Sequence, residues 1–322
     1  MNKWFHLNQK PKLNRPIFVA AWPGMGKVAF TAVAYLKKQF EAQVLGDIKA
    51  PEFFAPTGSV VRQQVIRPPE PADNRFYFYQ SPKGGSDIIF FLGSAQPVPH
   101  MEYQFAHRIL DVAEFFGVKR IYTTAAAPSD MQMHDTPRVF AVPNHSEILK
   151  ELLNQEVHFM GDGTIAGMNG LLISVARERD IEGVCLLGEI PFFTVQIEYP
   201  KASLQILEVL SKMLNHQVDL VDLELYTEEK EKDIEPLAHL LGRERPEQHK
   251  SELGEMTHPS IPLQDEKVPK AVKSRIEKLF KQAEFDLTYK SKMRLKEELD
   301  NWGVFRDYED RFLDLFKARG DS

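Results

Sequence analysis

Apolar runs that alternate with helical stripes constrain the fold of this chain more than any other feature of its sequence. Residues 87–92 are an almost unbroken apolar run that ends at Gly93, and such runs favour a strand covered on both faces. A stripe at helical spacing follows, made of Phe105, Ile109, Val112, Ala113 and Phe116. The same alternation recurs through residues 1–243, and it predicts a layered α/β fold with a largely parallel sheet.

The remaining elements follow from the same two periodicities. We predict further strands at residues 17–22, 43–48, 59–67, 75–80, 120–126, 138–142 and 183–189. We predict further helices at residues 29–40, 146–153, 168–176 and 202–214. Beyond Gly242 the composition becomes polar and rich in proline. The chain is therefore divided into a core domain at 1–243, a polar linker at 244–268 and a helical extension at 269–322.

The helical extension is predicted from two amphipathic stripes, at residues 272–283 and 308–316. Two short helices bury their own apolar faces poorly. We therefore expect them to pack on the core domain or on another chain.

Composition excludes several classes of protein. The formal net charge of -6 leaves no excess of Lys and Arg for phosphate contacts, which argues against a nucleic-acid partner. No apolar run is long enough to cross a membrane, and the N-terminus lacks the apolar core of a signal peptide. The single cysteine, Cys185, has apolar neighbours and is expected to be a buried, inert thiol. One cysteine cannot form an internal disulfide, so we expect a cytoplasmic protein.

The first candidate binding site is the glycine-containing turn after residues 17–22. Backbone N–H groups at such a strand–helix turn can hold an anion, and we assign Gly24, Gly26 and Lys27 to a possible anion or ligand nest. The segment is not a nucleotide-binding P-loop, because Ala21 replaces the first glycine and Val28 replaces the Ser or Thr. The alternative is a tight turn with no ligand.

The second candidate is the glycine-rich segment at residues 161–170. Gly161 and Gly163 begin a dinucleotide-type pattern, but Ala166 stands where the third glycine belongs. We include both glycines in the possible ligand nest. The alternative is close packing of the following helix through Gly167 and Gly170.

A third polar cluster holds Asp130, His134 and Asp135, after a predicted buried strand. Such residues can bind a metal or move a proton, but Asp and Ser also serve loop turns alone. No complete catalytic or metal-binding motif is present, so we predict no catalytic residues, no metal and no cofactor.

Three segments give the chain a family resemblance. They are the turn at residues 22–26, the pattern Gly163-Thr164-Ile165-Ala166-Gly167-Met168-Asn169-Gly170-Leu171-Leu172, and the strand at 183–189. In these, and in the strand at 120–127, residues 15–243 resemble the proteasome assembly chaperone family. The chain ends in Ala318-Arg319-Gly320-Asp321-Ser322 and lacks the Tyr-containing tail by which docking members often bind, so that route is not expected.

The resemblance implies a three-layer α/β/α sandwich similar to the nucleoside phosphorylase/hydrolase architecture, here with a C-terminal helical extension. It also implies a non-catalytic assembly-chaperone-like protein whose partner is a second copy or another protein subunit. The alternative is an enzyme or binding protein for a small phosphate- or nucleoside-containing ligand, which rests on the fold alone.

Overall fold

The computed structural model describes residues 4–54, 58–82, 85–242, 270–285 and 289–301, together with residues 308, 311, 312 and 315. The chain divides into two units, one of residues 1–160 and 164–254 and the other of residues 161–163 and 255–322. The predicted linker at 244–268 lies outside the described residues, and the predicted domain boundaries stay predictions.

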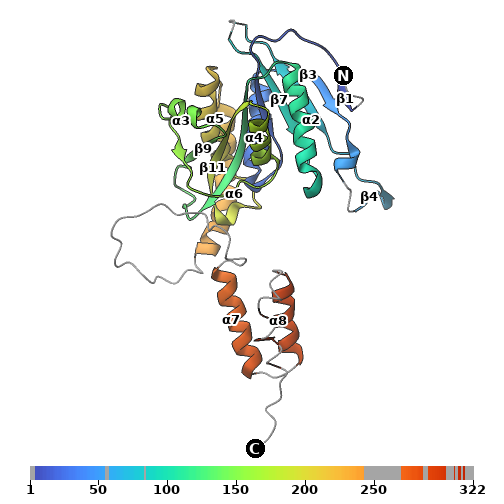
Figure 1. The fold of residues 1–322 in the computed structure, drawn as a ribbon. Helices are drawn as coiled ribbons and strands as arrows, with labels where there is room; N and C mark the ends of the chain where they lie inside the picture. The colour runs from blue at the N-terminus through green and yellow to red at the C-terminus, as the bar shows by residue number, and fades with distance from the viewer. Residues whose placement is uncertain are drawn as a thin grey trace, which may run out of the picture. The chain divides into compact units, whose positions relative to one another are not determined.

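The first unit is an α/β unit, and the second holds helices (Figure 1). The strands are β1 (Phe5–Leu7), β2 (Ile17–Ala21), β3 (Gln43–Ile48), β4 (Val60–Arg62), β5 (Val65–Arg67), β6 (Asn74–Tyr79), β7 (Ile88–Gly93), β8 (Arg120–Ser129), β9 (Val139–Pro143), β10 (His158–Phe159) and β11 (Glu182–Pro191). The helices are α1 (Val28–Gln39), α2 (Glu102–Phe115), α3 (Ser146–Leu152), α4 (Met168–Glu178), α5 (Pro200–Leu214), α6 (Val221–Gly242), α7 (Lys270–Phe285) and α8 (Tyr289–Asn301).

Within the described residues, the main sheet has nine strands in the order β1-β3-β6-β7-β2-β8-β11-β9-β10. The four central strands, β7, β2, β8 and β11, are parallel to their neighbours in that group. On the outer sides, β6 pairs antiparallel with β7, and β9 pairs antiparallel with β11. The sheet is therefore mixed, and the predicted parallel arrangement describes its centre. The short connection from β6 to β7 explains the change, because parallel neighbours need a long crossover.

Helices cover both faces of this sheet. Along β2 and the residue after it, Phe18, Ala20 and Trp22 point into one hydrophobic core, whereas Val19 and Ala21 point into the other. The first core also takes apolar side chains from α2 and α4, and the second takes them from α1 and α5. This alternation along a strand produces the three layers that the resemblance implies.

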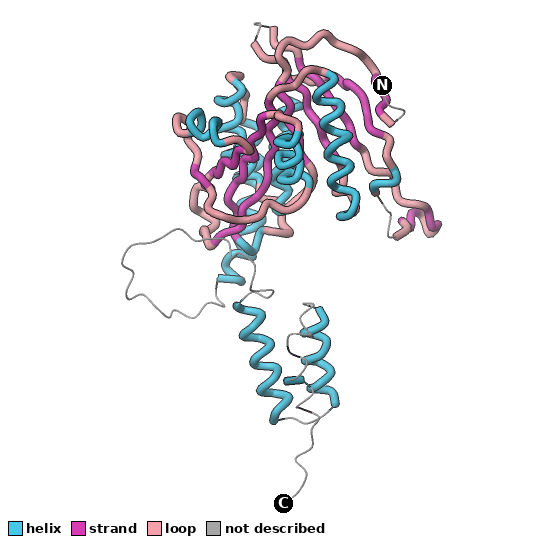
Figure 2. Tube along the Cα trace, viewed as in Figure 1, coloured by secondary structure: helices cyan, strands magenta, loops and turns pink. Residues whose placement is uncertain are grey.

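Several elements differ from the prediction. Residues 59–67, predicted as one strand, form the separate β4–β5 ribbon, because the chain reverses at Gln63 and Gln64. The short edge strands β1 and β10, the helix α8 and the part of α6 outside residues 228–233 were not predicted, and Figure 2 shows them with the other elements. Residues 228–233, whose charges alternate in sign as is typical of a solvated helix face, lie within α6.

The second unit has a hydrophobic core of its own. Ile276, Leu279, Phe280 and Ala283 from α7 pack with Leu295 and Leu299 from α8 and with Phe312. Arg311 donates two hydrogen bonds to Glu277, at 2.6 and 2.9 Å, and its guanidinium lies 4.1 Å from the centre of the Phe280 ring. The apolar stripe predicted at 272–283 is thus buried at least in part by neighbours in the same unit.

Candidate functional site

The parallel strands at the centre of the sheet end at one edge, where ligand sites of α/β proteins commonly form. After β2 the chain enters the first glycine-containing turn, in which Gly26 and Lys27 both adopt left-handed backbone angles, with φ of +60° and +52°. The Gly26 N–H donates to the carbonyl of Val195, and the Gly26 carbonyl accepts from the Tyr199 N–H, at 3.0 and 2.9 Å. The turn after β2 is therefore fixed to the segment after β11.

Three N–H groups of the first turn, those of Gly26, Lys27 and Val28, already have acceptors in the protein. Besides Gly26, Lys27 donates to the Gly24 carbonyl at 3.0 Å, and Val28 donates to the carbonyl of Met25. The Lys27 ammonium lies 3.1 Å from Glu198 Oε2, and Thr31 donates to the other oxygen of Glu198 at 3.3 Å. An anion at this turn would compete with Glu198 for the lysine, and the anion nest stays a prediction.

The second glycine segment lies against the first. The Asn169 side chain accepts from the Trp22 N–H at 2.9 Å and donates to the Trp22 carbonyl at 3.3 Å. Gln96 adds a second connection, since its Nε2 donates to the Pro23 carbonyl at 2.7 Å and its Oε1 accepts from the Met168 N–H at 3.1 Å. The two turns that the sequence presents as separate candidates are therefore joined by side chains.

Glycine is required at the start of α4 for two different reasons. Gly167, which precedes the helix, has φ of +79°, a conformation that L side chains rarely adopt. A Cβ on Gly170 would lie 2.5 Å from the Ile165 carbonyl oxygen. Gly161 and Gly163 are exposed, and a Cβ on Gly161 would meet nothing within 4 Å. A ligand at Gly161 and Gly163 stays a prediction.

An open groove of about 680 Å³ runs from this edge of the sheet along α1 to the start of α6, and we call it the α1–α6 groove. Its lining is largely apolar. The residues that line it are Pro23, Lys27, Phe30, Thr31, Ala34, Tyr35, Lys38, Ser94, Glu198, Asp222, Leu223 and Tyr226. Of the candidate site residues, Lys27 is the one that reaches the groove.

Charged groups of both signs line the α1–α6 groove, namely Lys27 and Lys38 beside Glu198 and Asp222. Burial raises the pKa of Tyr35, and the carboxylates of Asp222 and Asp219 raise it further. Burial likewise raises the pKa of Tyr226, with Glu198 as the next cause, whereas Lys230 and Lys27 lower it. The positive and negative charges around the two phenols therefore offset each other in part.

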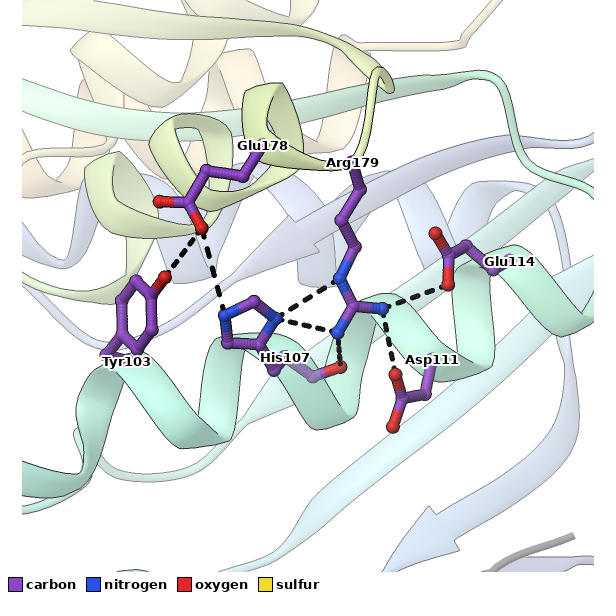
Figure 3. Close-up of polar contacts among 6 residues, drawn as sticks. All are labelled: Tyr103, His107, Asp111, Glu114, Glu178 and Arg179. Carbon is purple, nitrogen blue, oxygen red and sulfur yellow. Dashed lines mark hydrogen bonds and ion pairs between the residues drawn. The ribbon is translucent and has the colours of Figure 1, made fainter.

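A second polar cluster joins α2 to α4 (Figure 3). Arg179 donates to Asp111 at 2.8 Å and to Glu114 at 3.0 Å, and its guanidinium lies 2.7 Å from His107 Nδ1. Because a guanidinium has no acceptor, Nδ1 of His107 accepts this hydrogen bond. Hydrogen bonds and ion pairs of Arg179 therefore connect the end of α4 to α2.

The loop with Asp130, His134 and Asp135 shows turn interactions. Asp135 accepts from the Gln132 N–H at 2.8 Å, and Ser129 Oγ accepts from the Met131 N–H at 3.1 Å. Across the residues that the structure describes, no group of three His, Cys, Asp or Glu side chains could hold a metal ion. In the same residues, no helix combines the length and the apolar character needed to cross a membrane.

The comparisons with known proteins give a consistent result. The model of the PAC2 family matches residues 18–238. The chain is 25% identical over 227 residues to an uncharacterized protein of Methanocaldococcus jannaschii, a match that spans 70% of this chain and 84% of that one. It is similar in structure to Pyrococcus furiosus PbaB, described as an archaeal proteasome activator, with 25% identity and a TM-score of 0.63 over 72% of this chain and 97% of that one. It is also similar to Pyrococcus furiosus PbaA, described as an archaeal homolog of proteasome-assembly chaperone. The identity is 25% and the TM-score 0.56, and the match covers 74% of this chain and 98% of PbaA.

Proposed function

Because the chain belongs to the PAC2 family, we propose that it is a non-catalytic, assembly-chaperone-like protein that binds other protein subunits. The observation that carries this proposal is the similarity to PbaB and PbaA, which extends over almost their whole length. We further propose that the chain associates with itself or with a related subunit, in the cytoplasm. The single, buried cysteine suits a reducing compartment.

The α1–α6 groove supports binding of a protein surface. It is open and apolar, and exposed apolar side chains continue beyond it on α6, where Val221 and Leu225 are 55% and 60% exposed. Exposed apolar surface beside charged groups is typical of a protein interaction site. The charges of Lys27 and Glu198 offset each other in the groove, which suits recognition through apolar contacts with a charged rim.

The test is affinity purification of the tagged full chain from its own cells, followed by cross-linking and mass spectrometry. We expect one oligomeric protein complex to supply the subunit that copurifies in constant ratio. The purified subunit is then assembled in the presence and absence of the chain, and we expect its yield of complete complex to rise. A tagged unrelated protein of similar charge is the control.

Two results would contradict the proposal. The first is an assembly yield that the chain does not change. The second is stabilisation of the chain by inorganic phosphate or nucleosides in a thermal-shift assay, which would favour the small-ligand alternative. A ligand present at 100 times its Kd stabilises a protein by about 2.7 kcal/mol, which is readily measured.

A further inference from the structure

The first turn of α4 contains a chemically labile pair of residues. Asn169 is the only asparagine of the sequence that is followed by glycine. In an unfolded chain, the backbone nitrogen of the next residue can attack the side-chain carbonyl carbon of an asparagine, and a side chain on that next residue hinders the attack. Glycine has no side chain and lets the backbone reach the required conformation. Asn169-Gly170 is therefore the position at which this chain is most prone to lose a side-chain amide.

The reaction needs no reagent other than water. The Gly170 nitrogen forms a bond to Cγ of Asn169, its proton passes through solvent to the side-chain nitrogen, and that nitrogen leaves as ammonia. The product of this step is a five-membered succinimide ring. Water then adds to one of the two ring carbonyl carbons and breaks the bond between that carbon and the Gly170 nitrogen. Attack at Cγ gives aspartate, and attack at the main-chain carbonyl carbon gives isoaspartate.

In the folded chain, each group that must move for this attack has a partner. The Asn169 side chain accepts from the Trp22 N–H at 2.9 Å and donates to the Trp22 carbonyl at 3.3 Å, and the residue is 5% exposed. The Asn169 carbonyl accepts from the Thr123 hydroxyl at 2.6 Å. The Gly170 N–H donates to the Gly167 carbonyl at 3.2 Å. Both residues of the labile pair lie in α4, so the attack requires the start of this helix to unwind.

An aspartate at position 169 would fit this place poorly. Its second carboxylate oxygen would replace the amide nitrogen that lies 3.3 Å from the Trp22 carbonyl oxygen. A carboxylate donates no hydrogen bond, so two acceptors would face each other, and a buried charge would lack a partner. Isoaspartate lengthens the main chain by one carbon and displaces the residues that follow it in α4. Either product therefore opposes the return of α4 to the turn after β2.

We propose that Asn169-Gly170 is a site of spontaneous deamidation, which the folded chain protects and which reacts when the start of α4 separates from the turn after β2. The modification converts a reversible opening of the fold into a permanent loss of the connection between the two glycine-containing turns. The fraction of modified chains thus increases with the time that this part of the chain has spent open.

The first test follows the amide in the full chain at pH 8. Digestion with trypsin releases residues 151–177 as one peptide, which contains Asn169 and also Asn154, an exposed asparagine followed by Gln155. Mass spectrometry locates the mass gained when an amide becomes a carboxyl. In concentrated guanidinium we expect Asn169 to react faster than Asn154. In buffer we expect Asn169 to react more than about 100-fold more slowly than in guanidinium, because a packed helix opens rarely.

Two variants separate the chemistry from the protection. Gly170→Ala, in guanidinium, should slow the reaction at Asn169 several-fold and leave Asn154 unchanged, because the added methyl group hinders the attacking nitrogen. Thr123→Val removes the hydroxyl that donates to the Asn169 carbonyl. We expect it to leave the rate in guanidinium unchanged and to raise the rate in buffer by about fivefold, the effect of one hydrogen bond on such an opening equilibrium.

The second test uses Asn169→Asp, which has the side chain of one product. In the folded chain this buried carboxyl favours its protonated form, which can donate to the Trp22 carbonyl as the amide does. Its pKa is then higher than the value of about 3.9 in the unfolded chain, so stability is lost as the pH rises above that value. Relative to the unaltered chain, the unfolding equilibrium constant should increase about tenfold per pH unit up to the folded-state pKa. Urea denaturation measures this, with the exposed Asn154→Asp as the control.

Three results would overturn the inference. They are an Asn169 amide that persists in guanidinium as long as that of Asn154, an amide that is lost in buffer as fast as in guanidinium, and an Asn169→Asp variant whose stability relative to the unaltered chain does not change with pH. The proposed chaperone role is measured by the assembly yield of another complex, and it holds or fails independently of these three results.

Discussion

Asn169 joins the two glycine-containing turns, and its side chain is almost completely buried. The Asn169→Ala change leaves the N–H and the carbonyl of Trp22 without these partners. Each buried backbone group that loses its hydrogen bond destabilises the fold by about 1–3 kcal/mol. We expect the free energy of unfolding to fall by about 2–4 kcal/mol, measured by urea denaturation. Asn154→Ala, at an exposed position, is the control and should change it little. An equal loss in both variants would contradict the role assigned to Asn169.

Gly170 allows the close approach of α4 to Ile165. In an open helix, Gly→Ala would stabilise by about 1 kcal/mol. At Gly170 the new Cβ would lie 2.5 Å from the Ile165 carbonyl oxygen and 2.6 Å from its Cγ2. We therefore expect Gly170→Ala to lower the stability by about 1–3 kcal/mol, because overpacking exceeds the helix gain.

The matched control is Gly24→Ala in the other turn. Gly24 has extended backbone angles, and a Cβ added there would have Asn169 Nδ2 as its nearest neighbour, at 3.9 Å. We expect the free energy of unfolding of this variant to lie within about 0.5 kcal/mol of that of the unaltered chain. Thermal denaturation of both variants and of the unaltered chain gives the midpoints to be compared. A Gly170→Ala variant as stable as the unaltered chain would show that the segment at Ile165 can move aside.

The sequence alone indicates where glycine matters but not what it contacts. The apolar runs locate the turns, and the helical stripe places Gly170 on α4. The joining residues could not be predicted, because Asn169 lies 147 positions from Trp22, and Gln96 lies 73 from Pro23 and 72 from Met168. Asparagine and glutamine side chains carry no spacing signal for such long-range contacts. Without these contacts, the two glycine-containing turns could only be treated as separate candidate sites.

At the scale of elements, Glu189 on β11 pairs with Arg138 beside β9. The guanidinium donates at 2.8 and 2.7 Å, and the carboxylate side chain is 4% exposed. Burial by itself raises the pKa of Glu189, but hydrogen bonds from Arg138 and Ser129 outweigh it and leave the pKa below its usual value of 4.5. A carboxyl whose pKa is lower in the folded state stabilises that state above its unfolded pKa. This stabilisation is lost as the pH falls through the folded-state pKa.

We therefore expect Glu189→Gln to destabilise the protein by about 2 kcal/mol at pH 7, since it weakens a charge-assisted pair. As the pH falls from about 4.5 towards the lower folded-state pKa, the difference from the unaltered chain should shrink, because the unfolded chain binds a proton at Glu189 in this range before the folded chain does. Below the folded-state pKa both chains carry an uncharged side chain at this position. Urea denaturation between pH 3 and pH 7 measures this. Glu229→Gln, exposed on α6, is the control. A difference that stays constant with pH would contradict the assignment.

Elements with strong periodicity could be predicted, and short or highly charged ones could not. The core strands β2, β7 and β8 begin within one residue of their predicted positions. α8 and the full length of α6 could not be predicted, because charged residues interrupt their apolar stripes, and burial of a few positions such as Leu223 and Leu295 decides the helix. β1 has three residues and β10 two, too few to show an alternating pattern. Their pairing to β3 and β9 decides the structure at these edges.

At the scale of the whole molecule, the described residues form three hydrophobic cores, two against the sheet and one among the C-terminal helices. The two sheet cores were predictable, because the central apolar runs require cover on both faces. The core of the helical unit was not, since no apolar stripe marks α8 in the sequence. Of the helix predicted at 308–316, residues 308, 311 and 312 are helical, residue 315 lies in a turn and the others lie outside the described residues. With α8 present, α7 gains an apolar partner in its own unit.

Cys185 reports on the integrity of the α/β unit, because it lies in a central strand of the sheet. Its neighbours across the sheet are Thr123 on β8 and Val142 on β9, and the residue is 1% exposed. Burial raises the pKa of its thiol to about 12, although a hydrogen bond with Thr123 lowers it slightly. The thiol of the folded chain is therefore protonated at pH 8 and unreactive.

We expect a thiol reagent such as dithionitrobenzoate to leave the folded chain unlabelled at pH 8 and to label one thiol per chain in concentrated guanidinium. Under native conditions the labelling rate should follow the population of the unfolded α/β unit, because the Cys185 side chain lies in the core covered by α2 and α4 and is exposed only when that cover leaves the sheet. The rate should therefore rise in Asn169→Ala by about tenfold for each ~1.4 kcal/mol of lost stability, and it should remain unchanged in Asn154→Ala. A fast rate that does not respond to added denaturant would instead show that the helical layer over Cys185 opens locally, and it would assign the lowest stability of the unit to that layer.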